Sequence, residues 1–261
     1  MDDVHRIVGI PARRRRRGLL AGIPAALLVA AARAAERRHA DERPLDAQPR
    51  SRSERPGEGW TLRIDDRLLP GGDDAVLGAE VLRRVAAKLA DIATVVPDGP
   101  LARLREVPIV IDVACGDLRS MQYHPSVEWL EAHGYPAALV KCVHVPIAAQ
   151  IVTPTTAREQ PWVLLHELAH AYHDRVLSFD EPRIRGAFER FVASGRGERT
   201  LLFDGSRTRH YALTDPKEFF AEMTEAWFGS NDFHPFNRAE LLEGEPEIAA
   251  LMAAIWGEPR R

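Results

Sequence analysis

The chain has 261 residues, of which 45% are hydrophobic and 28% charged, a composition typical of a folded globular protein with one or two domains. Its two cysteines, Cys115 and Cys142, exclude a four-cysteine zinc ribbon or iron–sulfur site. Residues 1–34 hold seven arginines and two aspartates, so the rest of the chain carries 28 basic against 36 acidic side chains. Because nucleic-acid binding needs a basic surface, this acidic body argues against a nucleic-acid partner.

The first 35 residues have the pattern of an export signal. Arginines at 13–17 precede an apolar stretch at 18–32, and small residues typical of a cleavage site follow. The run Arg16-Arg17-Gly18-Leu19-Leu20 is also typical of twin-arginine signals. We therefore predict a signal over 1–35, an exported mature protein (secreted, periplasmic or cell-surface) and no stable membrane insertion after signal removal. An uncleaved anchor is the alternative, and the pattern leaves the export route open.

Residues 36–59 are polar, rich in Arg, Glu, Pro and Ser, and almost free of apolar side chains. Such a segment cannot offset the entropy of its own ordering by burial, so we predict a flexible linker. Residues 60–261 are then expected to form the folded domain.

Strand and helix patterns alternate irregularly through this domain. Working along the chain, hydrophobic periodicity and turn residues predict a strand at 60–65, a helix at 75–96, a strand at 107–113, a helix at 126–132 and a strand at 140–146. They further predict a long helix at about 161–177, a helix after Pro182, a hairpin at 200–213, and helices at 216–228 and 247–256. Because there is no strict βαβ alternation, the predicted fold class is α+β.

One motif dominates the chain, His166-Glu167-Leu168-Ala169-His170, or H-E-x-x-H, inside the predicted long helix. Residues four apart share one helical face, so both imidazoles can reach one metal ion. Glu167 lies between them and can take a proton from a metal-activated water. Five-residue patterns also arise by chance, but the apolar helix around this one favours a metal site.

A catalytic zinc normally has three protein ligands, so a third must come from elsewhere. His173 lies about 10.5 Å along the helix axis from His166 and cannot share the ion with both histidines; we expect it outside the ligand set or at the surface. Glu218 and Glu222 lie four apart on a downstream helix, where one can bind the metal and the other can hydrogen-bond a ligand histidine. A solvated acidic helix face is the alternative.

The motif H-E-L-A-H, together with a tyrosine seven residues before the downstream acid (Tyr211 and Glu218) and the run Glu218-Phe-Phe-Ala-Glu222, resembles the zinc peptidase domain of anthrax lethal factor and its relatives, which include the bacterial Pro-Pro endopeptidases. The similarity covers residues 143–228 at most. It implies a gluzincin-type, zincin-like fold: a small mixed sheet, an H-E-x-x-H helix and a second helix carrying the third ligand.

The resemblance also implies residue roles. His166, His170 and Glu218 would bind one Zn²⁺ per chain, and Glu167 would act as general base. Tyr211 would stabilise the oxyanion, and Glu222 would match the acid that supports a ligand histidine. The 52-residue separation between His166 and Glu218 departs from the family pattern and leaves the substrate class open.

The expected function is therefore exported, zinc-dependent endopeptidase activity on a peptide or protein substrate. The alternatives are a zinc-containing binding protein with little activity and a zinc hydrolase of non-peptide amides such as cell-wall links. Val140–Pro146 is the candidate edge strand for pairing with substrate, and an ordinary core strand is the alternative. A disulfide between Cys115 and Cys142, against two buried thiols, stays open, as does the oligomeric state.

Overall fold

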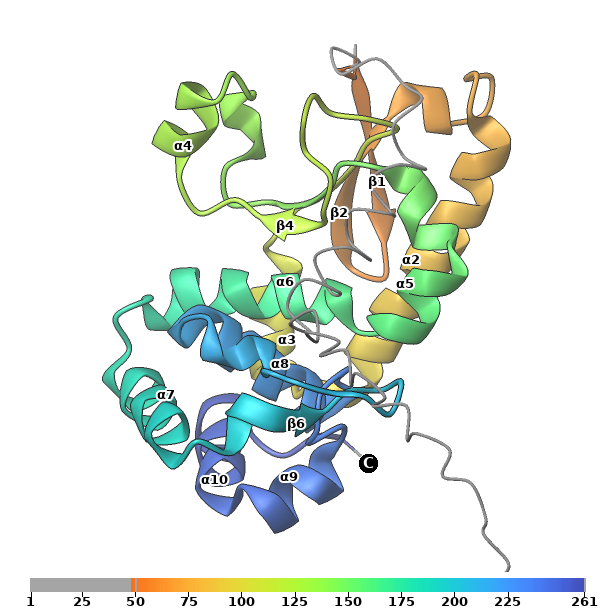
Figure 1. Ribbon diagram of the computed structural model, residues 1–261. Helices are drawn as coiled ribbons and strands as arrows, with labels where there is room; N and C mark the ends of the chain where they lie inside the picture. The colour runs from red at the N-terminus through yellow and green to blue at the C-terminus, as the bar shows by residue number, and fades with distance from the viewer. Residues whose placement is uncertain (1–47, 50, 261) are drawn as a thin grey trace, which may run out of the picture.

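The computed structural model describes residues 48–49 and 51–260 (Figure 1). The predicted export signal lies outside the described residues. Within the described part of the chain, no helix has the length and apolar character needed to cross a membrane. The described strands are β1 (Arg52–Gly57), β2 (Trp60–Asp65), β3 (Ile109–Ile111), β4 (Gln122–Tyr123), β5 (Val143–Val145), β6 (Thr200–Leu201) and β7 (Arg207–Thr208). The described α-helices are α2 (Ala75–Val95), α3 (Asp98–Arg105), α4 (Val127–Ala132), α5 (Pro154–Glu159), α6 (Val163–Tyr172), α7 (Pro182–Ser194), α8 (Pro216–Phe228), α9 (Arg238–Gly244) and α10 (Pro246–Trp256).

A small mixed sheet forms one half of the molecule, with strand order β1-β2-β3-β5-β4. Strands β2, β3 and β5 are parallel, whereas the outer strands β1 and β4 run antiparallel to their neighbours. Helices α7 to α10 form the other half, and α6 lies between the two (Figure 1). The predicted α+β class with a small mixed sheet is confirmed.

Strand β1 corrects the predicted linker. Arg52–Gly57 pairs along its whole length with β2, from Arg52 opposite Asp65 to Gly57 opposite Trp60. The turn uses Glu58 and Gly59, both at positive φ. The side chains of β1 are half-buried or exposed, so the strand is held mainly by backbone pairing and carries no apolar signal in the sequence. The prediction of flexibility is wrong for residues 52–57, and residues 36–47 lie outside the described part.

The edge of the sheet also differs from the expectation. The predicted edge strand at 140–146 contains β5, which lies between β3 and β4, with all three of its residues buried. Its role as a core strand, the alternative reading, is the correct one. The edge strand on this side of the sheet is β4, which is only two residues long and therefore leaves almost no pattern in the sequence.

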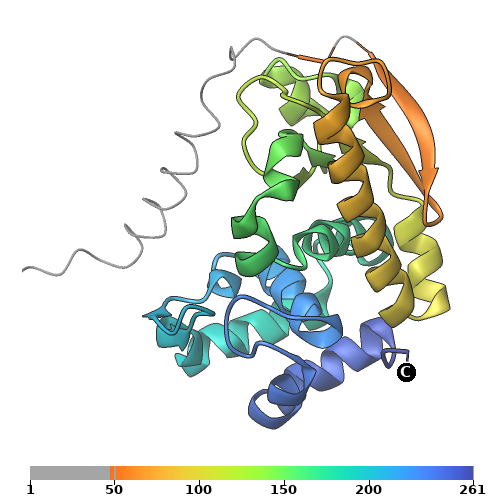
Figure 2. The same cartoon turned by 90° about the vertical axis from the view of Figure 1, so that its right-hand side faces the viewer.

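Two helices cover the main face of the sheet. The buried stripe of α2, formed by Val81, Val85, Leu89 and Ile92, belongs to the main core together with the inward residues of β2, β3 and β5. Figure 2 shows α2 running past the sheet toward the helical half. Helix α6 packs against β4 and β5 on one side and against α8 on the other. Helix α6 is thus enclosed between the two halves of the fold.

The opposite face of the sheet is covered by α4 and its flanking loops. A second, smaller core lies there and contains Val110, Cys115, Leu118, Leu130, Leu139 and Cys142. Both cysteines are free and buried. The open question of a disulfide is therefore answered in favour of two buried thiols.

Candidate metal centre

Helix α6 carries His166, Glu167 and His170 on a segment that is buried almost throughout. Leu164, Leu165 and Leu168 anchor it in the main core, so the position of the two histidines is set by packing on both sides. Their rings lie edge to face with centroids 4.8 Å apart. The helix begins at Val163, two residues after Pro161, and its α-helical part ends at Tyr172. A π-helical turn at His173–Leu177 completes the predicted long helix.

Helix α8 brings the predicted third ligand to this pair. It begins at Pro216, and the Asp215 carboxylate accepts hydrogen bonds from the backbone N–H groups of Lys217 and Glu218. Glu218 Oε2 lies 3.0 Å from His166 Nε2 and 3.5 Å from His170 Nε2. Ligand atoms of these three side chains all lie within 4.8 Å of one another, so the structure brings the predicted ligand set together.

The separations of Glu218 from the two histidines suit a shared metal ion. With zinc–ligand bonds of about 2.0–2.2 Å, two ligands of a tetrahedral ion stand about 3.3 Å apart. The separations of 3.0 and 3.5 Å from Glu218 to the two histidines match that value closely. The three side chains are nevertheless partly accessible, at 10% to 19% of their surface, which leaves a side open for a water or substrate.

Glu225 orients His166, the first of the two candidate ligand histidines. His166 Nδ1 donates a hydrogen bond of 2.7 Å to Glu225 Oε1, and this bond leaves Nε2 to face Glu218. Ligand histidines are commonly oriented by such a carboxylate. The sequence-based assignment of this role was Glu222, whose Oε1 lies 3.7 Å from His166 Nδ1. Glu225 was missed, although it lies seven residues after Glu218 on the same helical face.

The pKa values of His166 and Glu218 are shifted in opposite directions by their mutual hydrogen bond. Burial alone would lower the pKa of His166, but its hydrogen bonds to Glu218 and Glu225 raise that pKa well above the ordinary value. Burial opposes ionisation of Glu218, yet hydrogen bonds from His166 and His170 bring its pKa well below the ordinary value. The site therefore contains an ionised carboxylate that faces two imidazoles. A metal cation can take the place of the proton that the carboxylate and an imidazole otherwise share.

Glu167 lies between the metal-ligand group and the edge strand. It is 8% exposed, and burial raises its pKa above the ordinary value. The backbone N–H of Tyr123, in β4, donates a 2.8 Å hydrogen bond to Glu167 Oε2. The Tyr123 hydroxyl donates to Asp174 at 2.6 Å, so the edge strand is tied to α6 by its backbone and to the π-helical turn after α6 by its side chain.

Glu222 lies too far from His166 for the hydrogen bond that its predicted role requires. Its Oε2 is buried without a hydrogen-bond partner and lies 3.7 Å from His210 Nδ1. Burial, and then the nearby Asp232 and Glu225 carboxylates, raise its pKa well above the ordinary value. A buried carboxyl group with one oxygen that lacks a hydrogen bond and with other acids nearby favours its neutral form.

Tyr211 and His173 complete the set of predicted residues. Tyr211 begins a short 3₁₀ helix, η6 (Tyr211–Leu213), which packs against α8, so it is not in a hairpin arm as expected; the hairpin strands are limited to β6 and β7. Its role at the oxyanion stays a prediction. His173 is fully buried beside Phe179 and Phe220, and is not at the surface.

A second group of possible ligands lies elsewhere. Asp112, Cys115 and His144 are also close enough to hold an ion, but all three are buried and the Asp112 carboxylate already accepts two hydrogen bonds from Arg52, of 2.7 and 2.8 Å. A cation there would meet the guanidinium charge. The His166, His170 and Glu218 group is therefore the better candidate metal site of the described residues.

Comparison of the chain with protein-family models, with curated proteins and with solved structures finds no match.

Proposed function

We propose that the chain is an exported zinc-dependent endopeptidase with a zincin-like arrangement of its site. The observation that carries the proposal is the convergence of His166 and His170 from α6 with Glu218 from α8, 52 residues further along the chain, at metal-ligand spacing. If the H-E-x-x-H motif occurred by chance, a third ligand residue would not be expected at this distance from both histidines.

The residues around the ion have complementary tasks. Zinc held by His166, His170 and Glu218 would supply a Lewis acid that polarises the scissile carbonyl and lowers the pKa of a water molecule. Glu167, held in place by the Tyr123 N–H, accepts the water proton and delivers it to the leaving amine. Its raised pKa suits a group that both takes and returns a proton. The Tyr211 hydroxyl is proposed to donate to the developing oxyanion.

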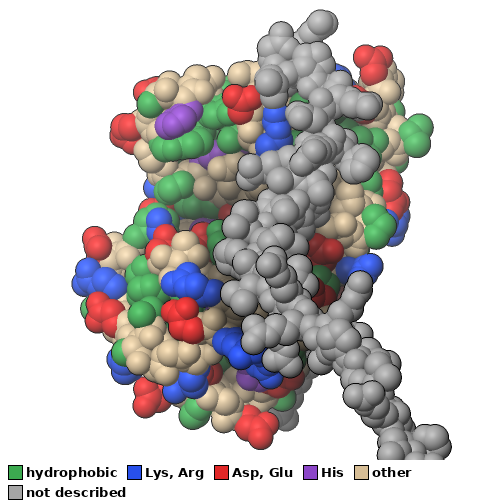
Figure 3. All heavy atoms as spheres, in the orientation of Figure 1, with side chains coloured by type: hydrophobic (Ala, Val, Ile, Leu, Met, Phe, Trp, Pro, Cys, Tyr) green, Lys and Arg blue, Asp and Glu red, His purple; other side chains and the backbone are tan. Residues whose placement is uncertain are grey.

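The edge strand supplies a place for the substrate backbone. The His124 N–H and C=O groups bond to the loop before β5. Because backbone groups alternate in direction along an antiparallel strand, the N–H and C=O of the neighbouring Tyr123 point away from β5. The Tyr123 N–H is taken by Glu167, which leaves its carbonyl for an incoming peptide N–H. The surface is hollowed between the sheet-bearing half and the helical half (Figure 3).

Two variants distinguish loss of zinc binding from loss of peptide hydrolysis. Glu167→Gln should keep one zinc per chain and lose roughly 10²- to 10⁴-fold in hydrolysis of a peptide mixture, since only the proton acceptor is removed. Glu218→Ala should lose the zinc itself. Full activity of Glu167→Gln would overturn the assigned mechanism. Cleavage of cell-wall fragments without any peptide product would overturn the peptide substrate.

A further inference from the structure

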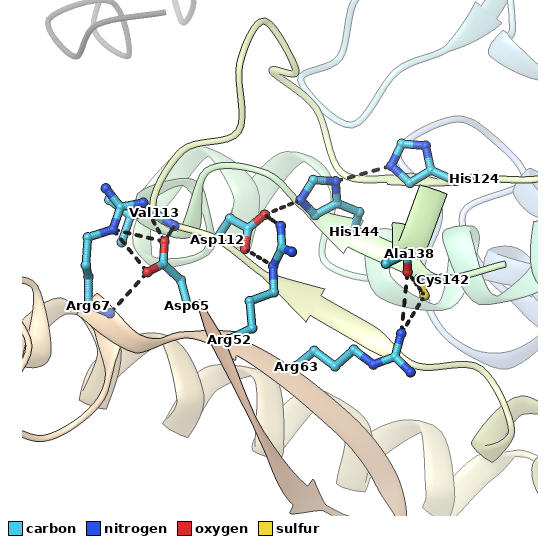
Figure 4. Close-up of polar contacts among 10 residues, drawn as sticks. All are labelled: Arg52, Arg63, Asp65, Arg67, Asp112, Val113, His124, Ala138, Cys142 and His144. Atoms are coloured by element: carbon cyan, nitrogen blue, oxygen red, sulfur yellow. Dashed lines mark hydrogen bonds and ion pairs between the residues drawn. The ribbon is translucent and has the colours of Figure 1, made fainter. Parts of the chain in front are cut away.

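A buried chain of polar side chains leads from β1 to the edge strand (Figure 4). Arg52 donates to both oxygens of Asp112, and His144 Nε2 lies 2.8 Å from Asp112 Oδ2. His144 Nδ1 in turn lies 3.2 Å from His124 Nε2. Asp112 and His144 are fully buried and His124 nearly so.

This chain assigns the hydrogen-bond roles of the ring nitrogens when both imidazoles are neutral. The Asp112 pKa is lowered, since the hydrogen bonds of Arg52 and His144 overcome the effect of burial, so the ionised carboxylate accepts a hydrogen bond from His144 Nε2–H. His144 Nδ1 then accepts from His124 Nε2. Burial, and then His144, lower the pKa of His124 to about 4, which keeps it neutral. The remaining nitrogen of His124, Nδ1, is therefore a hydrogen-bond acceptor.

His124 lines a pocket between β4 and α4, which we call the β4–α4 pocket. It has a volume of about 250 Å³ and is lined by Gln122, Tyr123, His124, Pro125, Ser126 and Trp129. That volume suits one large side chain and is smaller than the usual site for a whole small molecule. The rings of His124 and Trp129 are 28° from parallel with centroids 6.4 Å apart. Trp129 is 42% exposed, although its other neighbours, His133 and Tyr135, stack against it.

The position of the pocket relates it to the metal centre. Tyr123, one of its walls, is the residue whose N–H bonds to Glu167, and residues along a strand advance about 3.3 Å each. If a peptide lies along β4, the residue whose side chain enters the pocket is therefore within about two positions of the peptide bond that lies next to Glu167.

We propose that the β4–α4 pocket binds a tyrosine or tryptophan side chain of the peptide substrate beside the scissile bond. The ring packs against Trp129, and the hydroxyl or indole N–H donates to His124 Nδ1. The Arg52–Asp112–His144 chain is the positioning device that keeps this acceptor in place. This inference rests on the proposed peptidase function, and it names the side chain that the site selects.

The first experiment digests a proteome-derived peptide mixture and compares residue frequencies within two positions of each cut by mass spectrometry. We expect tyrosine and tryptophan to be enriched at one position, and Trp129→Ala to reduce that enrichment roughly fivefold, the effect of one aromatic stacking contact. Phe203→Ala, which removes another exposed aromatic side chain, is the matched control and should leave the preference unchanged. Equal profiles for wild type and Trp129→Ala would overturn the proposal.

The acceptor is tested by paired substrates. Wild type should cleave a tyrosine peptide several-fold faster than its phenylalanine analogue, because only the hydroxyl reaches His124. His124→Phe should lose this preference and keep the general preference for aromatic residues. If that variant does not fold, the wild-type substrate pair alone decides, and equal rates would overturn the role of His124.

A binding arm separates this inference from the proposed function. N-acetyltyrosinamide is titrated into Glu167→Gln protein, with and without Trp129→Ala, by saturation-transfer NMR, and N-acetylleucinamide is the control ligand. Trp129-dependent binding of the tyrosine probe supports the pocket even when no peptide is cleaved. Absence of that binding, or Trp129-dependent binding of an N-acetylglucosamine oligomer in its place, would overturn it.

Discussion

At the scale of single residues, the three acids of α8 have distinct environments although they share one helical face. Glu218 faces His166 and His170, Glu225 accepts a hydrogen bond from His166 Nδ1–H, and Glu222 has a buried oxygen without a hydrogen-bond partner. Their differences arise from what α6 and η6 place opposite each of them.

This contrast predicts unequal effects of the same substitution. Glu225→Gln removes the charge that orients His166 and should weaken zinc binding roughly tenfold. Glu222→Gln should change it little, because the raised pKa of Glu222 already favours a neutral carboxyl of the same shape. Competition with a chromophoric chelator measures both affinities. A larger loss in Glu222→Gln would return the orienting role to Glu222.

His173 gives the fold a dependence on pH. Both of its ring nitrogens are buried without a partner, and burial lowers its pKa from 6.5 to about 4. Between these values the unfolded chain takes up a proton that the folded protein does not, so the free energy of unfolding decreases as the pH falls from about 6.5 to 4.

His173→Leu should remove this contribution, on the order of 1–3 kcal/mol across the window. Urea unfolding at pH 7, 5.5 and 4.5, with a chelator present throughout, measures it. The variant should show the flatter profile, whereas His234→Leu, at an exposed histidine, should behave as wild type. Identical pH profiles for wild type and His173→Leu would contradict the assignment.

At the scale of elements, β1 is joined to the core by one side chain beyond its backbone pairing. Arg52 neutralises Asp112, which has no exposed surface. Strand β1 is therefore an outer strand of the sheet and also helps to hold His144 and His124 in place through Asp112.

Removing that guanidinium should be costly. Arg52→Leu leaves the Asp112 carboxylate buried beside His144 and Cys115 without its cationic partner, and we expect a loss of about 3 kcal/mol in the free energy of unfolding. Arg55→Leu makes the same change at an exposed site on the same strand and should cost little. Urea titrations followed by circular dichroism compare the two, and equal losses would show that Asp112 does not depend on Arg52.

At the scale of the whole molecule, the candidate metal site joins the helix between the two halves to a helix of the second half. An ion bound at a hundred times its dissociation constant stabilises the folded state by roughly 2.7 kcal/mol. For a chain of this size that corresponds to a rise of about 5–10 °C in Tm.

Thermal unfolding with zinc and with a chelator tests this link. Wild type should show the shift, Glu218→Ala should lack it, and Lys217→Ala, which changes the adjacent side chain, should retain it. A zinc-dependent shift that persists in Glu218→Ala would place the third ligand elsewhere.

Local chemistry in the sequence predicted much of the fold and of the site. Helix α8 has its predicted bounds, 216–228, because the Asp215 side chain caps its first turn and Pro216 fits the first helical position. His166, Glu167 and His170 were identified because a helix places residues four apart on one face whatever surrounds it. The buried stripe of α2 follows from the same periodicity.

Only the tertiary structure decided the features that depend on a distant partner. Strand β1 has no apolar pattern, and its order comes from hydrogen bonds to β2 and from Asp112. Glu222 and Glu225 lie on one face of α8, and the packing of α8 against α6 selects which of them meets His166. Helical periodicity sets the direction of a side chain, but the identity of the atom it meets depends on how a second element packs across it.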